Sequence, residues 1–195
     1  MKRVALLGSV LALAFAGCGL ITTPPIANPF QLAGKTTTFT LGPTSQASGT
    51  ANVTATFDDL TSLNLPAAPS DFTYNMAISS VSFGQGCPAT IPSPISVTLN
   101  ATLTLSDGSG ATVRSAEATA TNVQFTITTT GSQVTVGSIT NGALNLNVGQ
   151  TLPIIQNGGT NTAVLAAQIT TQSTPDLAGC SMTITWGGGQ GVLRF

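Results

Sequence analysis

Hydrophobic and polar residues alternate without interruption between positions 95 and 105. The odd positions carry Ile, Val, Leu or Ala, and the even positions carry Ser, Thr or Asn. A period of two residues over this length is typical of a β-strand with one apolar and one polar face. Turn-forming residues follow at 106–110, and a second strand-like segment returns over 111–120, so the pattern predicts a β-hairpin.

The same alternation predicts further strands along the chain. Their expected ranges are 36–41, 51–57, 123–127, 134–136, 143–148, 163–171, 182–186 and 192–195. Asn141-Gly142 is the dipeptide that type I′ turns favour, and it predicts a hairpin joining 132–140 to 143–148. Residues 58–65 are compatible with one helical turn. The Ala-rich segment 163–171 could also be a helical turn, although Ile169, Thr170 and Thr171 favour a strand.

One segment changes the parity of its hydrophobic positions. An even-numbered apolar set is followed by an odd-numbered one: Phe72, Tyr74, Met76 and Ile78, then Val81 and Phe83. A single inserted residue near Ser79-Ser80 would return both sets to the same side of a sheet. The sequence therefore predicts a β-bulge at this point.

About ten short strands without a clear helix indicate an all-β protein. Residues 35–195 are expected to form a single antiparallel β-sandwich-like domain, with a closed β-barrel as the alternative. A barrel of the outer-membrane kind needs aromatic girdles at both membrane interfaces. The chain has only one Tyr, one Trp and eight Phe, which favours the sandwich.

The first residues have the pattern of an export signal. Lys2 and Arg3 precede an apolar run over 4–16, which is shorter than the ~20 residues that a membrane-spanning helix needs. Ala14-Phe15-Ala16 is compatible with cleavage by ordinary signal peptidase. Phe15-Ala16-Gly17-Cys18 resembles the lipobox of bacterial lipoproteins, in which the cysteine is lipidated and becomes the first residue.

The number of cysteines favours the lipoprotein interpretation. The chain has three, Cys18, Cys87 and Cys180, and an odd thiol in an exported protein requires an explanation. Lipidation of Cys18 leaves Cys87 and Cys180, which can pair in an oxidising envelope. Both lie among loop-forming residues, so we expect a disulfide between strand ends.

The resemblance to bacterial lipoproteins implies a location as well as an anchor. Residues 1–17 would be the signal peptide, and Gly19 after the cysteine is typical of sorting to the outer membrane. Residues 18–34 hold the lipidated cysteine and Pro24, Pro25 and Pro29, which indicate an extended tether. An edge segment packed on the domain is the alternative for this stretch.

Composition excludes several classes of function. Five basic residues do not provide the positive footprint of a nucleic-acid-binding protein. The absence of histidine excludes Ser-His-Asp catalysis and imidazole metal ligands. The six carboxylates are scattered and match no calcium-loop spacing: Asp58, Asp59, Asp71, Asp107, Glu117 and Asp176. We therefore expect no catalytic residues, no metal and no cofactor.

Two features remain as candidates for binding. Trp186, beside the glycine-rich run 187–191, is a possible platform for stacking a sugar, although a core position is the commoner fate of tryptophan. Threonine is abundant, and we interpret it as the polar strand former of a solvent face rather than as an ice-binding array, because no repeat of constant length recurs.

These observations together predict a non-enzymatic protein anchored in the bacterial envelope. It would act in a structural, adhesive or accessory role, through Thr, Asn and Gln surfaces or exposed sheet edges. Its expected partners are the membrane, through the N-terminal lipid, and another envelope protein or a surface polymer. The alternative is a binding module for a hydrophobic ligand or a carbohydrate.

Overall fold

The computed structural model describes residues 22–42, 48–58, 60, 68–107, 113–172 and 177–195. In this part of the chain, strands dominate and one helix is present. The elements are β1 (Ile26–Ala27), β2 (Thr36–Thr40), β3 (Ser48–Asp58), β4 (Asp71–Asn75), β5 (Ile78–Phe83), β6 (Ile95–Asp107), β7 (Ser115–Thr130), β8 (Gln133–Val136), β9 (Ala143–Leu146), α1 (Val148–Ile155), β10 (Thr160–Gln172), β11 (Ser181–Trp186) and β12 (Gln190–Arg194).

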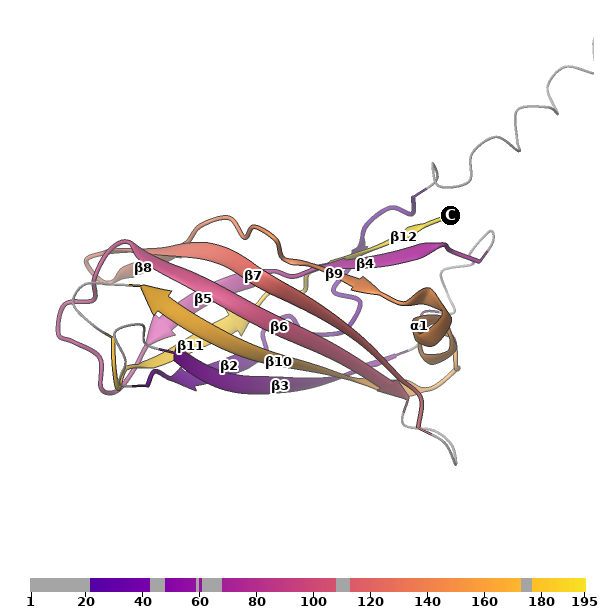
Figure 1. The fold of residues 1–195 in the computed structure, drawn as a ribbon, viewed down its shortest axis with the longest axis horizontal. Helices are drawn as coiled ribbons and strands as arrows, with labels where there is room; N and C mark the ends of the chain where they lie inside the picture. Colours follow the sequence, from indigo (N-terminus) through magenta and orange to yellow (C-terminus); the bar gives the residue numbers. More distant parts are fainter. Residues whose placement is uncertain (1–21, 43–47, 59, 61–67, 108–112, 173–176) are drawn as a thin grey trace, which may run out of the picture.

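The strands form two layers. One layer is a curled sheet of long strands in the order β3-β10-β6-β7-β8 (Figure 1). The other consists of two smaller sheets, β2-β11-β5 and β1-β12-β4-β9, which follow each other along the long axis. All hydrogen-bonded neighbours are antiparallel, and the strand order of each sheet is open. The predicted all-β, sandwich-like domain is confirmed.

The clearest predicted strand is also the centre of the large sheet. Along β6, the apolar odd-numbered positions from Ile95 to Leu105 are buried, and the even-numbered polar positions between them face outward. β6 pairs with β7 as an antiparallel hairpin, as the sequence predicts. β7 continues as one strand through the two segments that the sequence separates, because a register shift at Asn122 (φ 55°) changes the parity.

The predicted bulge in residues 72–83 is confirmed. Thr185 of β11 pairs with Ser80 and Trp186 pairs with Ile78, so Ser79 is the extra residue. The segment is nevertheless not a single strand, because β4 and β5 belong to different small sheets. The chain also passes from one small sheet to the other between β11 and β12 (Figure 1).

The hairpin predicted at Asn141-Gly142 is wrong. β8 pairs with β7, whereas β9 crosses to the other layer and pairs with β4. A type I′ turn needs a positive φ at both central residues, and only Asn141, with φ 58°, has one here. The Asn141 side chain donates instead to the Asn122 carbonyl (3.2 Å). This hydrogen bond links the segment between β8 and β9 to β7.

Helix α1 is not anticipated by the sequence pattern. It begins after Asn147, whose side chain accepts a hydrogen bond from the Gln150 amide (3.1 Å) as a helix N-cap. Ile154 and Ile155 of the helix are buried in the core. Val148, which the sequence places in a strand, is instead the first residue of the helix. The helical turn expected over 58–65 falls largely outside the described residues.

Residues 22–34 are part of the folded domain. β1 pairs with β12, and the Thr23 amide donates to the Leu193 carbonyl (2.9 Å). Phe30 and Leu32 are completely buried, and the Phe30 ring centroid lies 5.0 Å from that of Tyr74. The packed edge segment is therefore the alternative that the structure shows, and a domain boundary at residue 35 is wrong.

Candidate interaction surfaces

The outward side of the five-stranded sheet presents an almost uninterrupted set of uncharged polar side chains. We call this set the hydroxyl face. It comprises Thr50, Asn52 and Thr54 of β3, Gln168 and Thr170 of β10, Thr98, Asn100, Thr102 and Thr104 of β6, and Thr119, Gln124 and Thr126 of β7. The strict alternation of each strand directs the aliphatic partners of these residues into the core.

Strand register aligns the hydroxyl face into rows. One row runs from Thr170 through Thr98 to Gln124. Directly opposed side chains on neighbouring strands have Cβ atoms about 4.5–5.5 Å apart, so polar groups recur at nearly constant spacing. The hydroxyls of Thr102 and Thr119 lie 3.3 Å apart. The result is a dense array of hydrogen-bond donors and acceptors with few charges, one of which is the exposed Glu117 of β7, opposite Thr104.

The hydroxyl face is hollowed in two places. A depression of about 500 Å³ crosses β3, β10 and β6, and one of about 430 Å³ lies over β6, β7 and the segment that follows β8. Their lining residues are all uncharged: Thr50, Ala51, Asn52, Asn100, Thr102, Ala166, Ala167 and Gln168 in the first, and Ser96, Val97, Thr98, Gln124, Phe125, Thr126, Ser138, Thr140 and Gln172 in the second. A partner that binds in these hollows would therefore contact uncharged side chains, most of them polar.

A third hollow lies at the end of the molecule opposite α1. It has a volume of about 810 Å³ and lies between β5, residues 89–93 and the β7–β8 turn. The partly buried side chains of Phe83, Ile91 and Val134 give it an apolar component. The Thr129 amide donates to Ser93 Oγ (3.0 Å), which ties residues 89–93 to β7. We call this hollow the distal groove; the sequence pattern gave no indication of it.

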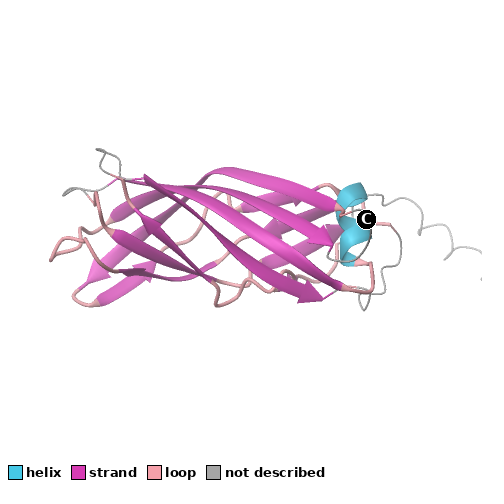
Figure 2. Cartoon of the chain, turned by 90° about the horizontal axis from the view of Figure 1, so that it is seen from below, coloured by secondary structure: helices cyan, strands magenta, loops and turns pink. Residues whose placement is uncertain are grey.

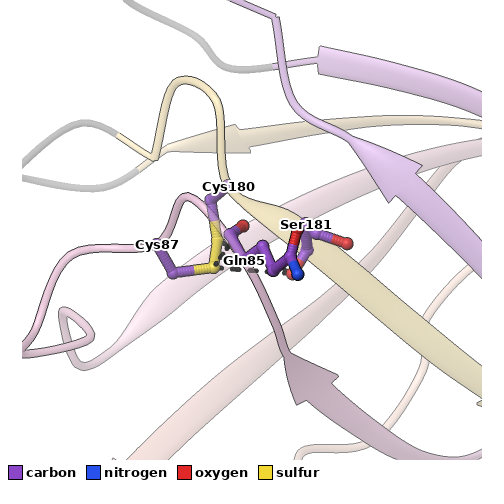
Figure 3. Close-up of a disulfide and its surroundings, with 4 residues drawn as sticks. All are labelled: Gln85, Cys87, Cys180 and Ser181. Atoms are coloured by element: carbon purple, nitrogen blue, oxygen red, sulfur yellow. Dashed lines mark hydrogen bonds between the residues drawn. A yellow bond between two sulfur atoms is a disulfide. The ribbon is translucent and has the colours of Figure 1, made fainter.

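Cys87 and Cys180 form a disulfide near the same end, as the sequence predicts (Figure 3). It joins the segment after β5 to the residue before β11, and Cys180 is completely buried. The Ser181 amide donates to the Gln85 carbonyl (2.8 Å), so the disulfide lies beside an existing backbone link. Cys18 falls outside the described residues.

Trp186 is a core residue and not a surface platform. Its side chain is 1% exposed, and its indole nitrogen donates to Thr37 Oγ1 at 2.7 Å. The prediction that it could stack a sugar is wrong for this structure. The glycines after it allow close packing, since a Cβ on Gly187 would lie 2.8 Å from that of Ala77.

The described carboxylates do not converge on a reaction centre. Buried Asp107 accepts from the Arg114 amide (2.9 Å) and lies 3.8 Å from its guanidinium. Asp71 lies 3.9 Å from Arg194. No group of three or more His, Cys, Asp or Glu residues that could hold a metal ion occurs within the described ranges. Asp59 and Asp176 fall outside them.

Comparisons of the chain with protein-family models, with curated proteins and with solved structures find no match. Within the described ranges, no helix has the length and apolar character needed to cross a membrane.

Proposed function

We propose that this chain is a lipid-anchored protein of the bacterial cell envelope that acts without catalysis, as an adhesive or accessory component, through contacts of its hydroxyl face. The observation that supports this proposal is the array of Thr, Asn and Gln side chains that covers most of the outward side of four strands. A surface of this kind suits a partner that offers neutral hydrogen-bonding groups, such as a surface polymer or another envelope protein.

The energetics of such contacts explain why an extended face is needed. A single hydrogen bond between uncharged groups contributes about 0.5–1.5 kcal/mol after the loss of hydration. With few charges, the face also provides little long-range attraction that would accelerate encounter. Binding must therefore come from many short-range contacts, and rows of aligned polar groups over several strands can supply them.

The proposed anchor compensates for weak individual contacts. Several acyl chains on Cys18 would hold the protein stably at a membrane, since one chain alone gives only marginal binding. Confinement at the surface raises the effective concentration of a partner that is held in the same envelope. Gly19 after Cys18 supports the outer membrane as the location.

Affinity capture with charged variants tests the role of the face. Gln168→Glu together with Thr126→Glu places one carboxylate in each hollow of the hydroxyl face. Thr36→Glu together with Thr40→Glu is the matched control, because both threonines are exposed on β2 in the other layer. Thermal melting should show that both variants fold.

The proposal predicts that tagged wild-type chain recovers a stoichiometric partner from solubilised envelopes. The control variant should recover it equally, and the variant in the hydroxyl face should lose at least about three-quarters of it. Consistent recovery of nothing, or equal recovery by the two variants, would contradict the proposed contact role.

The distal groove supports a second candidate function, the binding of a small hydrophobic ligand. Phe83, Ile91 and Val134 form its apolar part. N-phenylnaphthylamine, whose emission rises in apolar surroundings, is a suitable probe. This candidate predicts enhanced emission with the wild-type chain and its loss in Ile91→Asp but not in Val164→Asp, a partly buried position of β10. No enhancement with wild type would exclude it.

A further inference from the structure

We infer that the α1 end of the sandwich rests on the lipid surface, so that the long axis of the domain points away from the membrane. We call this end the basal end; it comprises Thr22, Asp71, α1, Val113, Arg114 and Arg194. The inference rests on the proposed lipidation of Cys18 and adds the surface of the domain that meets the bilayer.

The first step is the short distance between the anchor and the fold. Thr22 forms an antiparallel bridge with Arg194, and Leu193 donates its amide to Thr23 Oγ1 at 3.2 Å. The chain is therefore attached to the domain from Thr22 onward. The four residue steps from Cys18 to Thr22 span at most about 14 Å, so acyl chains on Cys18 would hold this edge close to the headgroups.

The second step is that the basal end is one continuous surface. Arg194 pairs with Asp71, and Phe72 pairs with Leu146, which lies two residues before the start of α1. The Arg114 side chain donates to the Pro153 carbonyl of α1 at 3.0 Å, which connects the other layer to the helix. Two views at right angles show α1 and the C-terminal residue at the same end (Figures 1 and 2).

The third step is the placement of exposed apolar surface. Val113 is the one large hydrophobic side chain that is exposed within the described ranges, and it is 73% exposed. It directly precedes Arg114, at the same end as the bridge of Thr22. Exposed apolar surface is stabilised at the boundary between headgroups and acyl chains. Chain reach and apolar exposure thus point independently to the same end.

The charged side chains of the basal end indicate which lipid headgroups it can contact. Arg114 lies 3.8 Å from Asp107 and Arg194 lies 3.9 Å from Asp71, so each cation has a carboxylate beside it. Asp58, at the end of β3, adds an exposed carboxylate. The basal end has no excess of positive charge, and it suits zwitterionic headgroups. The acyl chains supply the affinity, and the basal end sets the orientation.

Fluorescence quenching by brominated lipids tests this orientation. The full lipidated chain is reconstituted into phosphatidylcholine vesicles with brominated or ordinary acyl chains. Val113→Trp reports on the basal end, and Gln133→Trp is the matched control at the start of β8, at the opposite end and outside the lining of the distal groove. Buried Trp186 provides the same background in both variants.

Bromination should reduce the added emission of Val113→Trp at least twofold and leave that of Gln133→Trp unchanged. Including phosphatidylglycerol should not increase the quenching. Equal quenching of both variants, in chains that float with the vesicles, would overturn the orientation while leaving the anchor intact. If the wild-type chain does not float, or Cys18→Ser floats equally well, the anchor is wrong and the inference fails with it.

Discussion

Tyr74 and Trp186 show how polar atoms are accommodated in an apolar core. The Tyr74 hydroxyl donates to the Gly188 carbonyl (3.2 Å), and the Trp186 indole donates to Thr37 Oγ1 (2.7 Å). Both side chains are 1% exposed. Because a buried donor without a partner costs about 1–3 kcal/mol, these two contacts allow large aromatic residues to fill the space between the layers.

The fluorescence of Trp186 should report its burial directly. It is the chain's single tryptophan, so the native protein should emit at short wavelength and resist quenching by acrylamide. Unfolding in guanidinium should shift the emission to longer wavelength and make it accessible. Native emission that acrylamide quenches as freely as in the unfolded chain would mean that the side chain is exposed.

Burial of Tyr74 should make the fold sensitive to alkali. Burial raises the pKa of the Tyr74 phenol above its ordinary value, because it disfavours the phenolate. Below about pH 10 the phenol is neutral in both states, and above it only the unfolded state loses the proton. The free energy of unfolding should therefore fall as the pH rises above 10.

Tyr74→Phe removes this proton equilibrium and is the control. At neutral pH, it should cost about 1 kcal/mol through the lost hydrogen bond to Gly188. Urea unfolding between pH 8 and 11 should show a smaller decline for the variant than for wild type. Parallel declines would show that other groups cause the alkaline sensitivity.

At the scale of elements, alternation predicted the strands well and their partners poorly. The odd-even pattern identified β6, and the parity change located the extra residue near Ser79-Ser80. The register shift at Asn122 resembles a strand break in the sequence, although β7 is continuous. Pairing across layers depends on tertiary packing, which a local pattern does not contain.

Helix α1 and the packed segment 22–34 were not predicted, because their local sequence patterns do not indicate the structures that they form. Helix α1 spans eight residues and contains Pro153, so it is too short for a helical period to be evident. Residues 22–34 contain several prolines that favour a tether, but Phe30 packs among Phe57 and Tyr74, remote in sequence. In both cases, the contacts that decide the structure come from distant parts of the chain.

Substitution of Asn122 should test the bulge in β7. Its φ of 55° is accessible to Asn and Gly but costs a β-branched residue about 1–2 kcal/mol. Its backbone amide donates to Asn100 Oδ1, so replacing the side chain leaves this bond intact. Asn122→Val should lower the free energy of unfolding in urea by that amount, with Asn122→Gly close to wild type. An unaffected Asn122→Val would contradict the left-handed conformation.

Removal of the disulfide should weaken the fold without changing it. The bond links residues separated by 93 positions, for which chain entropy predicts a stabilisation of about 4–5 kcal/mol. β11 is also held by its pairing with β2 and β5. Cys87→Ser with Cys180→Ser should therefore retain the β-type circular dichroism and melt at a lower temperature. An unchanged melting temperature would refute the stabilising role.

On the scale of the whole molecule, the proposed anchor and the proposed contact surface lie on different parts of the domain. The basal end carries Thr22, only four residue steps from Cys18, whereas the hydroxyl face extends along the length of the large sheet. An anchored domain would expose this face sideways to neighbouring molecules in the envelope. The polar composition of the face was evident from alternation, but its rows require the register of four strands.

The distal groove is also a feature of the whole molecule, and the sequence pattern did not predict it. Its lining residues come from β5, the segment 89–93 and the β7–β8 turn. Neither their types nor their spacing indicates that they converge. Only the folding of β8 back along β7, beside β5, brings Val134 near Phe83.

The central claim is that a lipid on Cys18 holds this β-sandwich at a membrane. Intact-mass spectrometry of the mature protein, isolated from the envelope fraction of the bacterium that produces it, tests the claim most directly. The account predicts a chain that begins at Cys18 and carries the added mass of its acyl groups. An unmodified chain beginning at Gly17, after cleavage behind Ala16, would contradict it.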